Sequence, residues 1–336
     1  MSPPTRSEPT SPASLTDAIR AAQQHLSAAK VCLVAGASLS PIEQAEFSGF
    51  TQVLPHLTTV TTVEFHDVHD LYLSPAVEKL TSADVVVKFA HGPFNRAGLL
   101  QAALDSLQVR RAGHASGTDL LSQHKSLVKR LMLRSGVPTL EYVVAHGGTD
   151  ITGQIEHLRV RSDTDAFVVK PDDGNASEGL QWVPTAADAI KAVGDGRGRL
   201  LVEPYLPGRI ITVGTVSLAS QTFTLAPLEY LLDGRPIMDS AWKQHPHRAR
   251  AILEPATETQ VRAHAAAVHT AVGANGLSRT DFIIGANGSV VALEINTNVG
   301  LGRPHDLAQA FAATDLSYEA LVICQVASGL AFTRQR

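Results

Sequence analysis

The feature that most constrains the fold is an alternation of short apolar segments with helical patterns in the first third of the chain. The segments VCLVA (31–35), VTTVEF (60–65) and ADVVVKFA (83–90) read as strands, and helical spacing of apolar residues occupies 97–107. Strands that are apolar throughout are buried on both faces, which is typical of a parallel sheet covered by helices. This part of the chain therefore predicts an α/β domain.

Helix start signals support that alternation. Ser14 followed by Asp17 resembles a capping box before a helical pattern, and Ser74-Pro75 reads as an N-cap with proline at the first helical position. Further along, we predict one long helix over 118–135, closed by Gly136 and Pro138.

The remaining patterns divide the chain into parts. Strands are predicted at 140–145, 166–171 and 200–206, with helices near 151–160 and from Thr185. A strand-rich stretch, a helix over 257–272, a hairpin and further helices follow. We predict a disordered tail (1–13), an N-terminal α/β domain (14–120), a central lid domain (121–206) and a C-terminal domain with a metal site (207–336).

Charge and cysteine content exclude several classes of protein. The chain has 28 Lys and Arg against 32 Asp and Glu, so its surface lacks the cationic excess that nucleic-acid binding or a polybasic membrane anchor needs. Its two cysteines, Cys32 and Cys324, lie in apolar runs and predict buried free thiols in a reducing compartment. No apolar run is long enough for a membrane span. We expect a cytoplasmic protein without nucleic-acid or membrane partners.

The segment RTDFIIGANGSVVALEINTNVG (279–300) is the most informative for chemistry. Asn287-Gly288 is a strong hairpin-turn signal, and period-two spacing places Arg279 with Asp281 on one face and Glu294 with Asn296 on one face. If these faces coincide, the oxygens of two carboxylates and an amide meet, a set that suits Mg²⁺. The alternative is a row of polar residues on the solvent side of a surface hairpin.

Two other segments are weaker by themselves. FVVKPDDGNASEGL (167–180) ends a strand with a lysine before a loop of small residues, which would suit an anion or would equally form an ordinary hairpin loop. LLVEPYLPGR (200–209) reads as a strand that leaves the sheet into a loop.

Taken in order, these pieces resemble the ATP-grasp ligases, and within them the D-alanine–D-alanine ligase family, over about residues 31–330. AHGPFNRAGLLQAAL (90–104) is similar to that family's His-Gly loop, and 111–139 resembles its lysine-bearing stretch ending in Gly-x-Pro. FVVKP, EPYLPG and R-x-D…E-x-N then follow at the family's spacing. The resemblance implies an α/β (α+β) ATP-grasp fold of three domains.

The resemblance also implies roles for particular residues. ATP would be bound by Lys125, Lys170, Asn175, Ala176, Ser177, Glu203, Tyr205 and Leu206. One or two Mg²⁺ ions, with Mn²⁺ as a substitute, would be held by Asp281, Glu294 and Asn296. Arg279 would stabilise the tetrahedral intermediate, Lys243 matches a late phosphate-contacting lysine, and Ser177 belongs to the loop over the γ-phosphate. Substrate contacts would come from Gly300 and from Glu43 or Glu46 of the first loop, the alternative being that these glutamates lie on a solvated helix face. His91 and His305 would also contact substrate, and Arg303 would hold an anionic group of the acceptor or merely cap the surface loop.

The implied activity is ATP-dependent joining of a carboxylate donor to an amine acceptor through an acyl phosphate, with release of ADP and phosphate. The metal and phosphate parts of the family pattern are kept, whereas the amino-acid parts are not. Ile210 stands where a ribose-binding glutamate is usual, and LGRPHDL (301–307) replaces the acceptor loop with its serine. These departures favour other amino-acid-like substrates of natural-product type, and they predict that D-alanine is a poor acceptor.

Two alternatives stay open at this point. An intramolecular cyclo-ligase of the same fold would also suit the changed acceptor loop. The other alternative is a non-catalytic nucleotide-binding regulatory module. Such a module would have no need to keep Asp281, Glu294 and Asn296 together with Lys125 and Lys170, which argues against it. A homodimer is compatible with the sequence.

Overall fold

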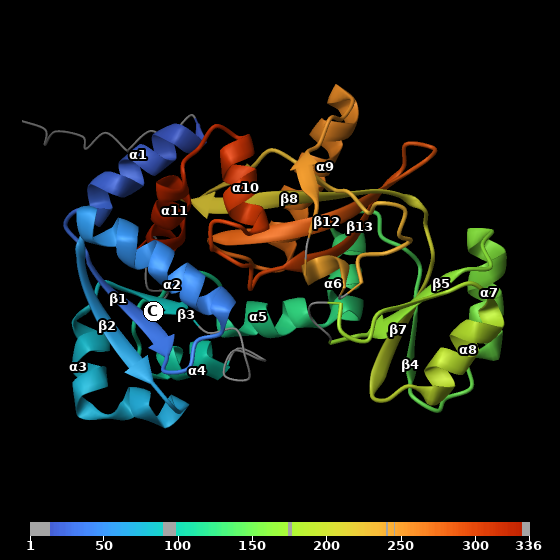
Figure 1. The fold of residues 1–336 in the computed structure, drawn as a ribbon, viewed down its shortest axis with the longest axis horizontal. Helices are drawn as coiled ribbons and strands as arrows, with labels where there is room; N and C mark the ends of the chain where they lie inside the picture. Colours follow the sequence, from blue (N-terminus) through green and yellow to red (C-terminus); the bar gives the residue numbers. More distant parts are fainter. Residues whose placement is uncertain (1–13, 90–98, 174–176, 240, 245, 331–336) are drawn as a thin grey trace, which may run out of the picture.

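The computed structural model describes residues 14–89, 99–173, 177–239, 241–244 and 246–330. Three separate sheets follow one another along the long axis of the molecule, each with its own helices (Figure 1). This mixture of helices and several sheets confirms the predicted α/β class. The predicted tail, His91, Asn175 and Ala176 lie outside the described residues. Within the described residues, no helix is long and apolar enough to span a membrane.

The first sheet is parallel, as the strand–helix alternation predicts. Strand β1 (Lys30–Gly36) lies between β2 (Thr59–Phe65) and β3 (Val85–Phe89). The helices of this part are α1 (Leu15–Leu26), α2 (Pro41–Val53), α3 (Ser74–Ser82) and α4 (Leu99–Ser106), with short 3-10 turns at Leu54–His56 and Val68–Tyr72.

The two predicted helix starts differ in outcome. The hydroxyl of Ser14 caps α1 and accepts a hydrogen bond from the backbone N–H of Asp17 at 3.1 Å, which confirms the predicted cap. Ser74 is instead the first residue of α3, and Leu73 takes the cap position without a side-chain bond. Pro75 lies in the first turn, where its missing N–H costs nothing.

The single helix predicted over 118–135 is wrong. The chain forms α5 (Ser116–Gln123) and α6 (Lys125–Arg134), and His124 between them has an extended backbone with φ −90° and ψ 95°. Asp172 stabilises the break because its carbonyl accepts from the N–H of Lys125 at 2.9 Å and its carboxylate accepts from the N–H of Ser126 at 2.7 Å. This partner lies 46 residues away from Ser126 in the chain, so the local apolar period could not reveal it.

The sheet at the far end of the molecule is antiparallel, with order β4-β7-β5-β6. Its strands are β4 (Val143–His146), β5 (Phe167–Pro171), β6 (Gln181–Val183) and β7 (Arg199–Pro204), and its helices are α7 (Thr152–Ser162) and α8 (Ala186–Asp195). Thr185 caps α8 by accepting from the N–H of Asp188.

The sheet in the middle carries the hairpin. Its order is β11-β10-β8-β12-β13, and β9 also pairs with β8. The strands are β8 (Gly208–Leu218), β9 (Gln221–Thr224), β10 (Leu228–Tyr230), β11 (Arg248–Arg250), β12 (Leu277–Gly285) and β13 (Val290–Asn296). The helices are α9 (Pro255–Ala271), α10 (Asp306–Ala313) and α11 (Tyr318–Leu330), with a 3-10 turn at Trp242–Gln244. Gly288 has φ +80°, the left-handed conformation that the predicted Asn-Gly turn requires.

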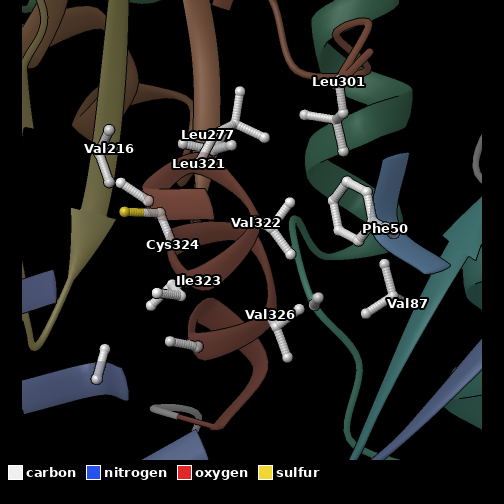
Figure 2. Close-up of a cluster of buried hydrophobic side chains, with 14 of the residues drawn as sticks. Phe50, Val87, Val216, Leu277, Leu301, Leu321, Val322, Ile323, Cys324 and Val326 are labelled. Carbon is white, nitrogen blue, oxygen red and sulfur yellow. The ribbon is translucent and has the colours of Figure 1, made fainter. Parts of the chain in front are cut away.

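One apolar core joins the first and middle sheets through α11. Figure 2 shows Cys324 of α11 directed toward Val216 of β8, whereas Val322 is directed toward Phe50 of α2. Cys32 and Cys324 are free and buried, as predicted. A second core packs α6 against α9 and the β12–β13 hairpin through residues such as Val128 and Met132. The domain boundaries predicted after residues 120 and 206 stay predictions.

Candidate nucleotide and metal site

The β12–β13 hairpin brings its polar residues to one place. In the register, Asp281 lies opposite Glu294, and Arg279 lies opposite Asn296. The amide of Asn296 donates to the Glu294 carboxylate at 3.3 Å. Asp281 is only 1% exposed, so this row does not form the solvent face of a surface hairpin. The two carboxylates and the amide therefore converge beside the middle of the molecule.

Lysines from three different elements surround Glu294. Lys125 begins α6, Lys170 lies near the end of β5, and Lys243 lies in the turn at Trp242–Gln244. Burial alone would raise the pKa of Glu294, but the positive charges of these lysines outweigh it and lower that pKa to about 2. Glu294 is therefore ionised across the physiological range. Burial together with the Glu294 carboxylate raises the pKa of Asp281, although Arg279 opposes this.

Glu203, at the end of β7, is held between two buried lysines. One carboxylate oxygen is 2.5 Å from the Nζ of Lys170, and the other pairs with Lys129 of α6. Burial would raise the pKa of Glu203, but both lysines lower it. Lys129 also donates to the hydroxyl of Thr139 at 2.7 Å. Lys129 was not predicted from the sequence, although its position four residues after Lys125 places both on one side of α6.

A cavity with about 1190 Å³ of empty space, including its open mouth, connects these groups. The polar residues that line it are Lys125, Lys170, Glu203, Asp281, Glu294 and Asn296, among others. The largely apolar side chains that line it include Tyr205, Leu206, Ile210, Met238, Ile283 and Leu293. Ile210, predicted to stand at the ribose position, contributes only hydrocarbon to this wall.

Two hydrogen bonds draw the segment 236–238 against the far-end sheet. The hydroxyl of Ser177 donates to the carbonyl of Met238 at 2.7 Å, and the hydroxyl of Tyr205 donates to the carbonyl of Pro236 at 3.1 Å. Ser177 has φ +59°, a left-handed conformation that is uncommon for serine. These bonds join lining residues of the cavity on the far-end side, Ser177 and Tyr205, to the lining segment 236–238.

Arg279 lies behind the carboxylates and does not line the cavity. Its Nε and one terminal nitrogen donate to the two oxygens of Asp281, each at 3.0 Å. Its other terminal nitrogen pairs with Asp306, the first residue of α10. Asp306, which lies inside the replaced acceptor loop, was also not predicted from the sequence.

The substrate residues predicted from the first loop are both buried rather than solvated. Glu43 closes a capping box with Ser40 at the start of α2. The carboxylate of Glu46 accepts from the N–H of Leu301 at 2.9 Å. Glu46 also lines a second, smaller cavity together with Lys88, His114, Asp119, Thr297 and Asn298.

The three candidate residues of the predicted acceptor loop, Gly300, Arg303 and His305, lie in different surroundings. The ring of His305 lies so close to Gly300 that a Cβ at residue 300 would be 2.7 Å from it, so glycine is required there. Arg303 is exposed, and its guanidinium lies 4.2 Å from the centre of the Tyr318 ring. Arg303 lines neither of the two cavities. Its role toward an acceptor stays a prediction.

Comparisons with known proteins agree with this arrangement. The model of the family "D-ala D-ala ligase C-terminus" matches residues 131–326. The D-alanine–D-alanine ligase of Oleidesulfovibrio alaskensis is 28% identical over 269 residues, which are 77% of this chain and 83% of the relative. That of Pseudarthrobacter chlorophenolicus is 28% identical over 290 residues, which are 81% of this chain and 75% of the relative.

Solved structures show the same fold. The D-alanine–D-alanine ligase from Bacillus anthracis complexed with ATP gives a TM-score of 0.71 at 17% identity, covering 90% of this chain and 97% of that one. The VanG D-Ala:D-Ser ligase from Enterococcus faecalis gives 0.69 at 15% identity, with 90% and 99% covered. The predicted ATP-grasp fold is confirmed. Because the family model matches more than half of the chain, this protein belongs to the D-Ala–D-Ala ligase family of ATP-grasp ligases, as the resemblance in its sequence predicted.

Proposed function

We propose that the protein is an ATP-dependent carboxylate–amine ligase, which forms an amide bond through an acyl phosphate and releases ADP and phosphate. One observation carries the proposal: Asp281 and Glu294 face each other at the end of a cavity where Lys125, Lys170 and Lys243 gather around them. Such a cluster suits a polyphosphate and its counter-ions, because phosphoryl transfer depends on positioning and charge neutralisation.

The residues that line the cavity suit a nucleotide. The adenine would lie against the apolar wall, with the carboxylate of Glu203 and the backbone of Tyr205 and Leu206 along its edge. Lys125 and Lys170 would contact the phosphates, and Ser177 with Asn175 and Ala176 would cover the γ-phosphate. The position of Lys170 supports this order, because it pairs with Glu203 and its charge also acts on Glu294.

The residues at the hairpin also fit a divalent cation. Asp281, Glu294 and Asn296 offer only oxygen ligands, the type that Mg²⁺ prefers, and an ionised Glu294 is ready to bind. The described residues hold no group of three or more His, Cys, Asp or Glu suited to a metal, which agrees with a cation shared between few protein ligands and phosphates. When bound, Mg²⁺ or Mn²⁺ would neutralise phosphate charge.

The protein's own groups would then serve the two chemical steps. The donor carboxylate attacks the γ-phosphorus and ADP leaves; the acceptor amine attacks the acyl carbonyl and phosphate leaves. Lys243 would contact the transferred phosphoryl group. Arg279 does not line the cavity, so its charge would stabilise the oxyanion of the tetrahedral intermediate from behind Asp281. The bonds of Ser177 and Tyr205 to the 236–238 segment would help keep water from the acyl phosphate.

For the substrates, we propose amino-acid-like molecules other than a D-alanine pair. Consecutive residues line the two cavities: Asn296 lines the first, and Thr297 and Asn298 line the second. Its lining includes Glu46, Lys88 and Asp119, so it offers charges of both signs to a zwitterion. Gly300, Arg303 and His305 would border the acceptor, with His91 and Glu43 nearby.

A screen of donor and acceptor pairs tests the proposal. The purified protein, ATP and Mg²⁺ would be incubated with amino acids singly and in pairs, with phosphate release and product mass measured. We expect phosphate release to depend on a specific pair, with D-alanine a poor acceptor. Efficient D-alanyl-D-alanine synthesis would contradict the substrate assignment. A product from one substrate alone would show intramolecular ligation, and ATP binding without release for every pair would favour a regulatory module.

A further inference from the structure

Arg279 is shared between two carboxylates of different elements. It donates to both oxygens of Asp281 at 3.0 Å each, and its remaining terminal nitrogen pairs with Asp306. Its guanidinium also lies 6.0 Å from the centre of the Tyr230 ring. Arg279 is therefore fixed on three sides, and its single positive charge is divided between Asp281 and Asp306.

Asp306 is itself held by a second guanidinium. The oxygen of Asp306 that does not face Arg279 is 2.7 Å from a terminal nitrogen of Arg248, and Arg248 is anchored on the carbonyl of Pro304. The side chains of Asp306 and Arg248 are 17% and 12% exposed, so water screens this row only weakly. The charges alternate in the order Arg248, Asp306, Arg279, Asp281.

This row of charges matters because Arg279 and the proposed divalent cation compete for the carboxylate of Asp281. As a proposed metal ligand Asp281 must offer an oxygen to a cation, yet both of its oxygens already accept from Arg279. A guanidinium held tightly on Asp281 lowers the negative charge available there and repels an incoming divalent cation. The carboxylate of Asp306 opposes this by attracting the same guanidinium.

We propose that Asp306 is a positioning residue that draws Arg279 away from Asp281 and thereby frees Asp281 for the divalent cation. The inference rests on the proposed metal role of Asp281. Asp306 does not touch the cation or the nucleotide, and it acts only through Arg279. The replaced acceptor loop, in which Asp306 lies, would then serve the metal end of the site as well as the substrate.

Mn²⁺ binding in the presence of ADP, followed by calorimetry or by the spin-resonance signal of free Mn²⁺, tests the inference directly. Asp306→Asn keeps the shape and an acceptor oxygen but removes the charge, so Arg279 would turn wholly to Asp281. We expect the Mn²⁺ Kd to rise about 5- to 10-fold, within the usual range of coupling between neighbouring sites. Asp306→Glu should restore near-normal binding. The matched control is Asp315→Asn, because Asp315 is exposed just after α10 at φ +59°, which asparagine tolerates.

A second variant predicts the opposite sign and serves if Asp306→Asn does not fold. Arg248→Gln removes the competitor of Arg279 for Asp306, so Asp306 would attract Arg279 more strongly and the Mn²⁺ Kd should fall. A folded Asp306→Asn protein with unchanged Mn²⁺ affinity overturns the inference, as does an Arg248→Gln protein that binds Mn²⁺ more weakly. An Asp306→Asn variant that changes only the acceptor KM would show that Asp306 binds substrate instead.

Asp281→Asn separates this inference from the proposed function. If Asp281→Asn binds Mn²⁺ normally, Asp281 is not a ligand and the metal assignment fails together with the inference. If Asp281→Asn loses Mn²⁺ while Asp306→Asn keeps wild-type affinity, the metal assignment stands and only the role of Asp306 is refuted.

Discussion

At the scale of single residues, Glu294 is the side chain on which the proposed chemistry depends most. Its pKa near 2 keeps it ionised, and its neighbours are lysines from three separate elements. We expect Glu294→Gln to lower the rate of ADP release at least about 100-fold, the usual cost of removing one charge-stabilising group at a reacting centre. Thermal unfolding should show an intact fold. Glu156→Gln, on the exposed face of α7, is the control, and a folded Glu294→Gln enzyme with normal turnover would refute the metal assignment.

Lys129 provides a second test at this scale. Its removal leaves the fully buried carboxylate of Glu203 with Lys170 as its partner, and an uncompensated buried charge is costly. We expect Lys129→Met to reduce the free energy of unfolding by about 3 kcal/mol and to weaken ATP binding. Urea denaturation and nucleotide titration would measure both effects. The exposed Lys191→Met on α8 should change neither, and an equally stable Lys129→Met protein would contradict the prediction.

At the scale of elements, the break between α5 and α6 determines where Lys125 lies. Asp172 is 0% exposed and replaces the missing cap of α6, while Arg199 pairs with the same carboxylate at 2.8 Å. We expect Asp172→Ala to cost about 1–3 kcal/mol, because the N–H and hydroxyl of Ser126 and the Arg199 guanidinium lose their carboxylate acceptor. Lys125 would then be displaced, so the KM for ATP should rise.

Thr185→Ala on α8 is the matched control for that experiment. It removes a surface helix cap and should cost about 1 kcal/mol without changing the KM for ATP. An Asp172→Ala protein whose KM for ATP stays normal would show that the cap does not position Lys125.

The same elements show what the sequence could and could not predict. Period-two spacing paired Arg279 with Asp281 and Glu294 with Asn296, but it could not decide whether the two faces coincide. Asp281 lies opposite Glu294 because the register shifts at an irregularity between Asp281 and Phe282, which the spacing does not reveal. The break at His124 was not predictable, because its stabilising partner, Asp172, comes from another sheet. Asp306 was missed for the same reason, since its ion pairs reach residues on β11 and β12. Local patterns predicted elements, whereas contacts between distant elements determined the site.

At the scale of the whole molecule, two buried histidines, His269 and His114, make the stability of the fold depend on pH. His269 of α9 lies between the hydroxyls of Ser217 and Ser278, and burial lowers its pKa to about 3. His114 accepts from the N–H of Asn275 at 2.9 Å, and burial lowers its pKa as well. Both rings are thus neutral in the folded protein at neutral pH.

Because the unfolded chain binds a proton near pH 6.5 and folded His269 does not, stability is complete above that pH and is lost as the pH falls toward 3. We expect a loss of about 2 kcal/mol from His269 at pH 5. Urea denaturation between pH 5 and 8 would measure it, with exposed His25→Gln as the control. His269→Gln should flatten the slope, and an unchanged slope would refute the assignment.

The position of α11 beneath the first sheet has a consequence for how the chain is made. Strands β1 and β3 are synthesised early. Part of the core that covers them comes from Leu321, Val322 and neighbouring residues of α11, which are among the last of the described residues to be synthesised. The apolar side of this sheet would therefore remain exposed in the nascent chain until α11 is synthesised. We expect nascent chains that stop before Tyr318 to be protease-sensitive in their first hundred residues, so that the order of synthesis and the order of folding run in opposite directions.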